Sequence, residues 1–383
     1  MKTAAHKMSQ FKDSIFGVIS QLARENQSVN LGQGFPDFDG AQWLKDIVNQ
    51  KIQEGHGQYA PFMGSAHLRE EIASYYKRFY KLSYDPINEI TVTVGATEAL
   101  YSTLTALLDR DDEVIVLEPF YDSYVASIQL SGAKPIPVTM HAPDFTVDPI
   151  ELEKAVSAKS KVLVINNPHN PTGKVWTREE LTHIAQFAQK HDLLVISDEV
   201  YEFLLFDGAV HIPMATLDGM KERTLTISSA GKTFGLTGWK IGWVCAPEHL
   251  TRAIRLVHQY VSFSVSTPMQ EAVAEGLKRL ETYVPGFQAQ YKEKRDYFYQ
   301  GITKLGFDFP TPKGTYFMMV PISNKTNKRD VDYAMELIKN KKVATVPPSS
   351  FYLKSKQGES YLRFCFAKKQ ETLESALANL EGL

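Results

Sequence analysis

The chain has 383 residues, of which 43% are hydrophobic and 22% charged, and its formal net charge is −2. This composition is that of an ordinary globular protein, and the length exceeds the usual limit of a single hydrophobic core, so two domains are expected. The nearly balanced charge argues against a nucleic-acid partner and against binding to an anionic membrane surface.

The cysteines, the histidines and the longest apolar runs exclude further classes of protein. Cys245 and Cys365 lie far apart within apolar runs, which predicts buried free thiols in a reducing compartment. The ten histidines show no metal-ligand spacing, so no metal site is expected. The apolar patch at 15–19 does not resemble a signal peptide and no run is long enough to cross a bilayer, which predicts a cytoplasmic protein with no membrane partner.

From residue 89 onward, short apolar runs alternate with amphipathic segments. Strands are predicted at 89–94, 113–117, 161–165, 193–196, 225–227 and 241–244. Helices are predicted at 97–108 and 177–191, and the second opens on a capping box from Thr177 to Glu180. Wholly apolar strands separated by helices predict an α/β fold, with a mostly parallel sheet flanked by helices on both faces.

The distal part of the chain has a different pattern. A long charged helix is predicted at 288–304, strands at 314–320 and 360–366, and helices at 331–340 and 372–380. The predicted division is therefore a large domain over residues 40–285 and a small α+β domain. The small domain would combine the N-terminal arm, residues 1–39, with residues 286–383.

The segment from Ser228 to Trp243 carries the strongest chemical signal. It places Lys232 in a Ser/Gly-rich turn directly after an apolar strand, where desolvation lowers the pKa of a lysine and makes it a nucleophile. The best-known use of such a lysine is a Schiff base with pyridoxal phosphate, and Lys240 is placed to neutralise the cofactor phosphate. The alternative is an exposed loop with two ordinary surface lysines, so the assignment depends on the rest of the chain.

Polar residues follow the predicted strands repeatedly, at the edge where doubly wound sheets bind ligands. Asp198 ends one strand and would pair with a protonated pyridine nitrogen, although Asp is also a common helix N-cap. The hydroxyl of Tyr201 would contact the phenolic oxygen of the cofactor, unless it is an ordinary core tyrosine. After another strand, the turn Asn166–Gly173 contains two prolines and aims Asn170 at the cofactor or at a substrate carboxylate.

Three further features complete the candidate site. The backbone N–H groups of Ala96 and Thr97 open a predicted helix and suit a phosphate. Phe120 or Tyr121 follows a strand and would stack on the pyridine ring, with rim packing as an equally good alternative. Arg363 lies in an apolar strand and needs an anionic partner, which is either a substrate α-carboxylate or a structural carboxylate.

With these motifs the chain resembles the fold-type I pyridoxal phosphate enzymes, and specifically the class I/II aminotransferases. The resemblance runs from Asn30-Leu31-Gly32-Gln33-Gly34-Phe35-Pro36-Asp37-Phe38 to Arg363-Phe364-Cys365-Phe366-Ala367-Lys368. His169, Gly238-Trp239-Lys240 and the run from His258 to Phe263 are most similar to the branch of methionine and kynurenine–glutamine aminotransferases.

The resemblance implies a role for each matching residue. Catalytic roles fall to Lys232, Asp198 and Tyr201, with Lys232 also carrying the proton between Cα and the cofactor. The implied cofactor-binding residues are Ala96, Thr97, Tyr121, Asn166, Asn170, Asp198, Tyr201, Ser229, Lys232, Lys240 and, from a neighbouring subunit, Tyr59. The implied substrate-binding residues are Phe16, Gly34, Asn170, Arg363 and, again from the neighbour, Phe263. A homodimer with shared active sites is therefore expected.

Two positions depart from the pattern of the family. Members that prefer aromatic substrates carry a tryptophan where Phe16 aligns and often a histidine where Ser264 aligns. This difference favours methionine, with phenylalanine, tyrosine, kynurenine and glutamine as further possibilities. Thr97 replaces a tyrosine of many relatives, a change that leaves the backbone N–H in place.

The expected activity is ping-pong transamination between an amino acid and a 2-oxo acid. One alternative uses the same cofactor and the same Cα carbanion: β-elimination from cysteine S-conjugates or cystathionine. The other alternative is a non-catalytic ligand-sensing protein, which the complete set of site residues disfavours.

Overall fold

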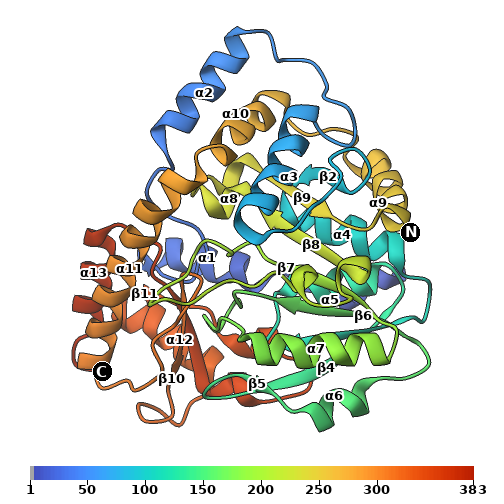
Figure 1. Ribbon diagram of the computed structural model, residues 1–383. Coiled ribbons are helices and arrows are strands. Elements are labelled where there is room, and N and C mark those ends of the chain that lie inside the picture. The colour runs from blue at the N-terminus through green and yellow to red at the C-terminus, as the bar shows by residue number, and fades with distance from the viewer. Residues whose placement is uncertain (1–3) are drawn as a thin grey trace.

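The computed structural model describes residues 4–383. Its centre is one eight-stranded sheet, which helices cover (Figure 1). The strands in spatial order are β2 (Ile90–Val94), β9 (Ile241–Cys245), β8 (Thr224–Ser229), β7 (Leu194–Asp198), β6 (Ser160–Asn166), β3 (Glu113–Glu118), β4 (Lys134–His141) and β5 (Thr146–Val147). The run from β8 to β4 is parallel, whereas β9 is antiparallel to both of its neighbours and β5 is antiparallel to β4. The predicted α/β fold with a mostly parallel sheet is confirmed.

The strands are apolar throughout because helices cover both faces of the sheet. In β3 and β6, one set of alternating residues packs with α4 (Gly95–Leu107), α5 (Asp122–Leu130) and α9 (Glu248–Val261). The intervening residues pack with α6 (Pro149–Ala155) and α7 (Arg178–Lys190) on the other face. The predicted capping box at the start of α7 is present, with Thr177 and Glu180 each accepting a backbone N–H of the other.

Three more helices extend the covering layers. They are α2 (Gln42–Gln53), α3 (Ala66–Tyr80) and α10 (Thr267–Leu277), and α10 packs against both α2 and α3. Two short segments complete this part of the chain: the helix α8 (Ala230–Thr233), which follows β8 directly, and the 3-10 turn at Thr237–Trp239. No helix in residues 4–383 is both long and apolar enough to cross a membrane.

Segments from near both ends of the chain pack together, since α1 (Ile15–Glu25) contacts β11 (Val343–Ala344) and α13 (Gln370–Leu380) contacts β1 (Val29–Asn30). There β10 (Phe317–Pro321) pairs antiparallel with β12 (Tyr361–Cys365), and β1 pairs parallel with β11. Around them lie α1, α11 (Leu280–Lys304), α12 (Asp330–Glu336) with the π-helical turn Leu337–Lys341, and α13. The division into a large and a small domain stays a prediction; its boundary after residue 285 lies within α11.

The sequence did not predict β4 or β5, and two predicted elements start at other residues in the structure. Helix α11 starts at Leu280 rather than at residue 288, although Pro285 interrupts its backbone hydrogen bonding. The buried side chains of Leu280, Val284 and Phe287 pack into the core on both sides of Pro285, and this packing stabilises the helix there. Strand β10 starts at Phe317 rather than at residue 314, because Thr315 adopts the left-handed conformation with φ 61°.

Candidate active site

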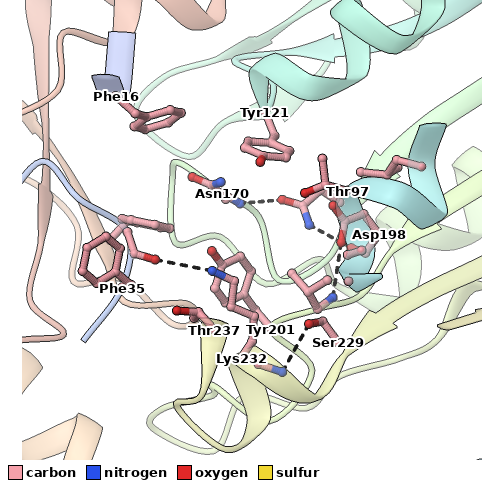
Figure 2. Close-up of a pocket in the computed structure, with 18 of the residues that line it drawn as sticks. Phe16, Phe35, Thr97, Tyr121, Asn170, Asp198, Tyr201, Ser229, Lys232 and Thr237 are labelled. Atoms are coloured by element: carbon pink, nitrogen blue, oxygen red, sulfur yellow. Dashed lines mark hydrogen bonds between the residues drawn. The ribbon is translucent and has the colours of Figure 1, made fainter. Parts of the chain in front are cut away.

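A cavity of about 310 Å³ lies beside the carboxyl ends of β6, β7 and β8 (Figure 2). It brings together thirteen of the fifteen predicted site residues: Phe16, Gly34, Ala96, Thr97, Tyr121, Asn166, Asn170, Asp198, Tyr201, Ser229, Lys232, Lys240 and Arg363. Parallel strands end at one edge of a sheet, so polar residues that follow successive strands converge there. Figure 2 shows Phe16 and Tyr121 on one side of the cavity, with Tyr201 and Lys232 on the other.

Lys232 projects into the cavity from α8, the short helix after β8. Ser229 caps this helix, since its hydroxyl accepts the N–H of Gly231 at 3.2 Å. The amine of Lys232 lies 2.9 Å from the hydroxyl of Tyr316 and 3.4 Å from the carbonyl oxygen of Gly34. Burial lowers the pKa of Lys232 to about 8, so part of the population carries a free amine near neutral pH.

Asp198 ends β7 and is 4% exposed. Its Oδ2 accepts a hydrogen bond of 2.5 Å from the hydroxyl of Tyr124, and its Oδ1 accepts the N–H of Val200 at 3.3 Å. Burial raises the pKa of Asp198 to about 6, while these two hydrogen bonds act in the opposite direction. In residues 4–383 no cationic side chain hydrogen-bonds to this buried carboxylate, which suits a positively charged ring nitrogen.

Asn166 holds the neighbouring turn in place. Its Nδ2 donates to the backbone oxygen of Asp198 at 2.8 Å, and its Oδ1 accepts the N–H of Asn170 at 2.6 Å. These two bonds fix the polar turn after β6 against the end of β7. Asn170 is consequently aimed at Arg363, whose Nη1 donates to its Oδ1 at 3.1 Å.

Arg363 is a buried cation that forms no ion pair with any residue in 4–383 and is 1% exposed. Its Nη2 donates to the carbonyl oxygen of Gly32 at 2.8 Å, whereas its Nε has no partner in the same range. The rings of Phe317, Phe16 and Phe351 surround the guanidinium, with centroids 4.1, 4.9 and 5.4 Å from Cζ. A desolvated guanidinium whose N–H groups are not all hydrogen-bonded can bind a carboxylate ligand.

The end of the cavity formed by the start of α4 and by Lys240 is suited to bind a small anion. Helix α4 starts at Gly95 with no side-chain cap from Val94, and its first three residues, Gly95, Ala96 and Thr97, line the cavity. The first N–H groups of a helix have no partner within the helix and suit an anion. Lys240 adopts the left-handed conformation, and a Cβ on Gly95 would lie 3.1 Å from its Nζ. Gly242 allows β9 to pack directly against the start of α4, because a Cβ at Gly242 would lie 2.6 Å from the backbone carbon of Gly95.

Tyr59 and Phe263 are not among the residues that line the cavity. They are 82% and 49% exposed, and their rings pack edge-to-face with centroids 5.3 Å apart. The sequence assigns both to the active site of a neighbouring subunit, and that assignment stays a prediction.

Several residues of the site were missed at the sequence level. Gln33, Phe35, Gly95, Leu100, Val200, Gly231, Thr237 and Phe317 also line the cavity. Tyr124 and Tyr316 bind Asp198 and Lys232 respectively. Tyr124 lies three residues after Tyr121, within one helical turn, and this spacing was the available signal. Tyr316 had no local signal, because its partner lies 84 residues away.

The fold and this cavity define an α/β enzyme of the aminotransferase type. The chain belongs to the aminotransferases of class I and II, whose family pattern it matches over residues 26–380. This match confirms the predicted family, fold class and enzyme class.

Three relatives show how similar the chain is to known members. It is 39% identical over 388 aligned positions to a probable N-succinyldiaminopimelate aminotransferase of Mycobacterium tuberculosis, with 98% of each chain covered. It is 38% identical to a kynurenine–oxoglutarate transaminase of Dictyostelium discoideum, with 97% of this chain and 94% of that one covered. A solved structure from Escherichia coli, described as having a methionine aminotransferase function, matches with a TM-score of 0.96, 38% identity and 100% of both chains covered. These relatives carry three substrate names at nearly equal identity, so similarity alone does not select the substrate.

Proposed function

We propose that the cavity binds pyridoxal phosphate and that the enzyme moves the amino group of an apolar amino acid, methionine above all, to a 2-oxo acid. The observation that carries this proposal is Arg363, a buried cation with no ion pair in residues 4–383, on the same cavity as the desolvated Lys232. Together they provide a carboxylate-binding group and a reactive amine for one small molecule.

The residues present fit the cofactor. Asp198 offers a buried carboxylate for the ring nitrogen, Tyr121 an aromatic face, and Tyr201 a hydroxyl for the phenolic oxygen. The N–H groups of Ala96 and Thr97, with Ser229 and Lys240, provide the anion-binding end for the phosphate. When bound, pyridoxal phosphate supplies an electron-accepting ring that stabilises negative charge at the substrate Cα.

The residues of the chain supply binding and proton transfer. Arg363 and Asn170 hold the α-carboxylate, which fixes the orientation of the Cα–H bond. Lys232 takes the Cα proton at Nζ, and its lowered pKa suits a general base near neutral pH. Asp198 keeps a negative charge beside the ring, and the surrounding buried aromatic residues exclude water.

The walls around Arg363 favour an apolar substrate side chain. Phe16, Phe35 and Phe317 line the cavity, and Phe351 packs against Phe16 with ring centroids 5.8 Å apart. The cations that line it, Lys232, Lys240 and Arg363, all have a role already, so among residues 4–383 no further cation lines the cavity to bind a second substrate carboxylate. This supports methionine, with phenylalanine, tyrosine, kynurenine and glutamine as further donors, over N-succinyldiaminopimelate.

A half-reaction panel tests the proposal. The purified enzyme loaded with pyridoxal phosphate is mixed with single amino acids while the visible absorbance of the bound cofactor is followed. We expect methionine to convert the band fastest, with aromatic donors and glutamine slower and aspartate slowest. A loaded enzyme whose band methionine leaves unchanged would contradict the substrate. Release of pyruvate from a cysteine S-conjugate without any added 2-oxo acid would favour β-elimination instead.

Lys232→Ala tests the role of the amine. We expect this variant to lose the visible band of the attached cofactor and all transamination, because no other group replaces the amine at that position. Lys174→Ala is the matched control, since that lysine is paired with Glu180 and lies outside the cavity. Transamination retained by Lys232→Ala would contradict the proposal.

We also propose that the enzyme is a homodimer in which Tyr59 and Phe263 enter the neighbouring active site. Both residues are exposed in the single chain, and Tyr260 close by is 82% exposed. Sedimentation velocity is expected to give one species of twice the chain mass. Cytoplasmic location stays a prediction from the sequence.

A further inference from the structure

Tyr316 connects Lys232 to another part of the chain. Its hydroxyl lies 2.9 Å from the amine of Lys232 and 2.6 Å from the carbonyl oxygen of Gly34. Tyr316 is 1% exposed, and its backbone oxygen accepts the N–H of Phe366 at 3.0 Å. The side chain is therefore fixed in place before any ligand arrives.

The direction of each hydrogen bond follows from the atoms involved. A carbonyl oxygen only accepts, so the proton of Tyr316 is committed to Gly34. The phenolic oxygen then offers its lone pairs to Lys232, whose amine donates both to it and to Gly34. The free amine thus has two acceptors at a defined position inside the cavity.

We propose that Tyr316 is a further catalytic residue, which holds the free amine of Lys232 and stabilises the proton that this amine takes from the substrate. The inference rests on the proposed function, since it concerns the proton-carrying step of the same site. In that step the amine gains one proton at Nζ and becomes an ammonium group. Tyr316 stays neutral throughout and gives up no proton.

The contact also couples the lysine to substrate binding. Gly34 is predicted to bind the substrate carboxylate through its backbone, and its carbonyl is the acceptor for both Tyr316 and Lys232. The backbone of Gly34 is therefore hydrogen-bonded both to the hydroxyl of Tyr316 and to the amine of Lys232.

Other charged or polar groups around the amine do not replace this contact. Those that act on Lys232 are Asp198, Lys240, Arg363 and Cys365, and the ring of Tyr201 lies 5.5 Å from Nζ. Within residues 4–383, the amine of Lys232 forms hydrogen bonds only with Tyr316 and Gly34. Loss of the Tyr316 hydroxyl therefore leaves a buried ammonium group with one acceptor fewer.

Tyr316→Phe tests the inference, and cyanate labelling provides a readout that does not depend on activity. The full chain freed of cofactor is treated with cyanate between pH 6 and 9.5, and carbamylation of Lys232 is followed by peptide mass spectrometry. Cyanate reacts with the unprotonated amine, so the pH profile reports the pKa of Lys232. We expect the midpoint in Tyr316→Phe to fall by about one pH unit, because a hydrogen bond to a charged group is lost.

Steady-state kinetics of the loaded enzyme give the second readout. We expect kcat of Tyr316→Phe to fall about tenfold while KM for the amino acid changes little, because the contact serves the proton-carrying amine. Tyr291→Phe is the matched control. Its ring stacks against that of Tyr316 with centroids 6.2 Å apart, and no hydrogen bond joins its hydroxyl to Lys232 in the described residues.

The outcomes separate the two proposals. An unchanged labelling midpoint in Tyr316→Phe, or an unchanged kcat, would overturn the role of Tyr316. Equal effects in Tyr291→Phe would do the same, since they would indicate disturbed packing. Absence of transamination in the unaltered enzyme would reject the proposed function, while a shifted labelling midpoint would still establish the contact with Lys232.

Discussion

The hydroxyl of Tyr124 donates a hydrogen bond of 2.5 Å to Oδ2 of Asp198, and both residues are almost completely buried. This bond opposes the effect of burial on the carboxyl group, whose pKa stands at about 6 rather than at the usual 3.8. Tyr124 thereby keeps Asp198 ionised at neutral pH, in the state that pairs with a cationic ring nitrogen.

Tyr124→Phe is expected to raise the pKa of Asp198 above about 6, because a donor to the ionised form is removed. Under the proposed function, cofactor affinity requires the carboxylate and falls as the pH drops through this pKa. In Tyr124→Phe the cofactor affinity should therefore fall at a higher pH than in the unaltered enzyme. Fluorescence titration with pyridoxal phosphate between pH 5 and 8 measures this affinity. Tyr101→Phe, a half-buried tyrosine of α4, is the control, and identical pH profiles would refute the prediction.

Asp198→Asn is expected to stabilise the cofactor-free protein while weakening cofactor binding. The folded pKa lies above the unfolded one, so ionisation of Asp198 costs stability as the pH rises from about 4 to about 6. Below that range both states are protonated and the variant gains nothing. Above it the gain is roughly 3 kcal/mol. Chemical denaturation at pH 4 and pH 7.5 checks the pH dependence, and a loss of stability at both values would contradict it.

Arg363→Lys is expected to raise KM for the amino donor roughly a hundredfold while leaving the visible band of the loaded enzyme intact. A lysine keeps the charge, but it cannot donate to Asn170 and Gly32 at once and still face a carboxylate with two N–H groups. Steady-state kinetics with methionine measure this effect. Arg329→Lys is the control, because its side chain is 61% exposed and paired with Glu359. An unchanged KM would remove Arg363 from the substrate site.

Gly242→Ala is expected to abolish tight cofactor binding. The added Cβ would lie 2.6 Å from the backbone carbon of Gly95 and 2.7 Å from the nitrogen of Ala96, so it would displace the start of α4. The phosphate would then lose the N–H groups of that turn. Gly238→Ala is the control, since its Cβ meets nothing within 4 Å. Equal affinities of the two variants, measured by equilibrium dialysis, would show that the close approach is unimportant.

Glu118→Gln is expected to loosen the segment that carries Phe351. The buried carboxylate of Glu118 accepts the backbone N–H groups of Leu353, Lys354 and Ser355 at 2.7, 3.1 and 2.8 Å. An amide in its place can accept through one atom only, which leaves at least one of these part-buried N–H groups without its acceptor. The expected cost is roughly 2 kcal/mol of unfolding free energy.

The same variant should also raise KM for the amino acid, because Phe351 packs beside Arg363 and Phe16. Chemical denaturation and steady-state kinetics measure the two effects together. Glu153→Gln is the control, as that carboxylate lies on the surface with Lys190. A destabilised variant with an unchanged KM would show that Glu118 supports the fold but not the substrate wall.

The sequence by itself predicted six of the eight strands of the large sheet, all but β4 and β5, and one edge of the site. Apolar strands without polar alternation predict burial on both faces, and that pattern is local in the chain. Asn166, Asp198, Ser229 and Lys232 could be placed because each lies at the end of such a strand or within a few residues of it. Parallel strands then bring these ends together without further information.

Only the tertiary structure decided what each of these groups contacts. Arg363 binds Asn170 and Gly32, which lie 193 and 331 residues away, and Tyr316 reaches Lys232 across 84 residues. Because Thr315 forms a local turn, β10 starts at Phe317, and the hydrophobic pattern of the sequence did not predict this start. Such contacts depend on how separate elements pack, and pairings at that separation leave no periodic trace in the amino-acid sequence.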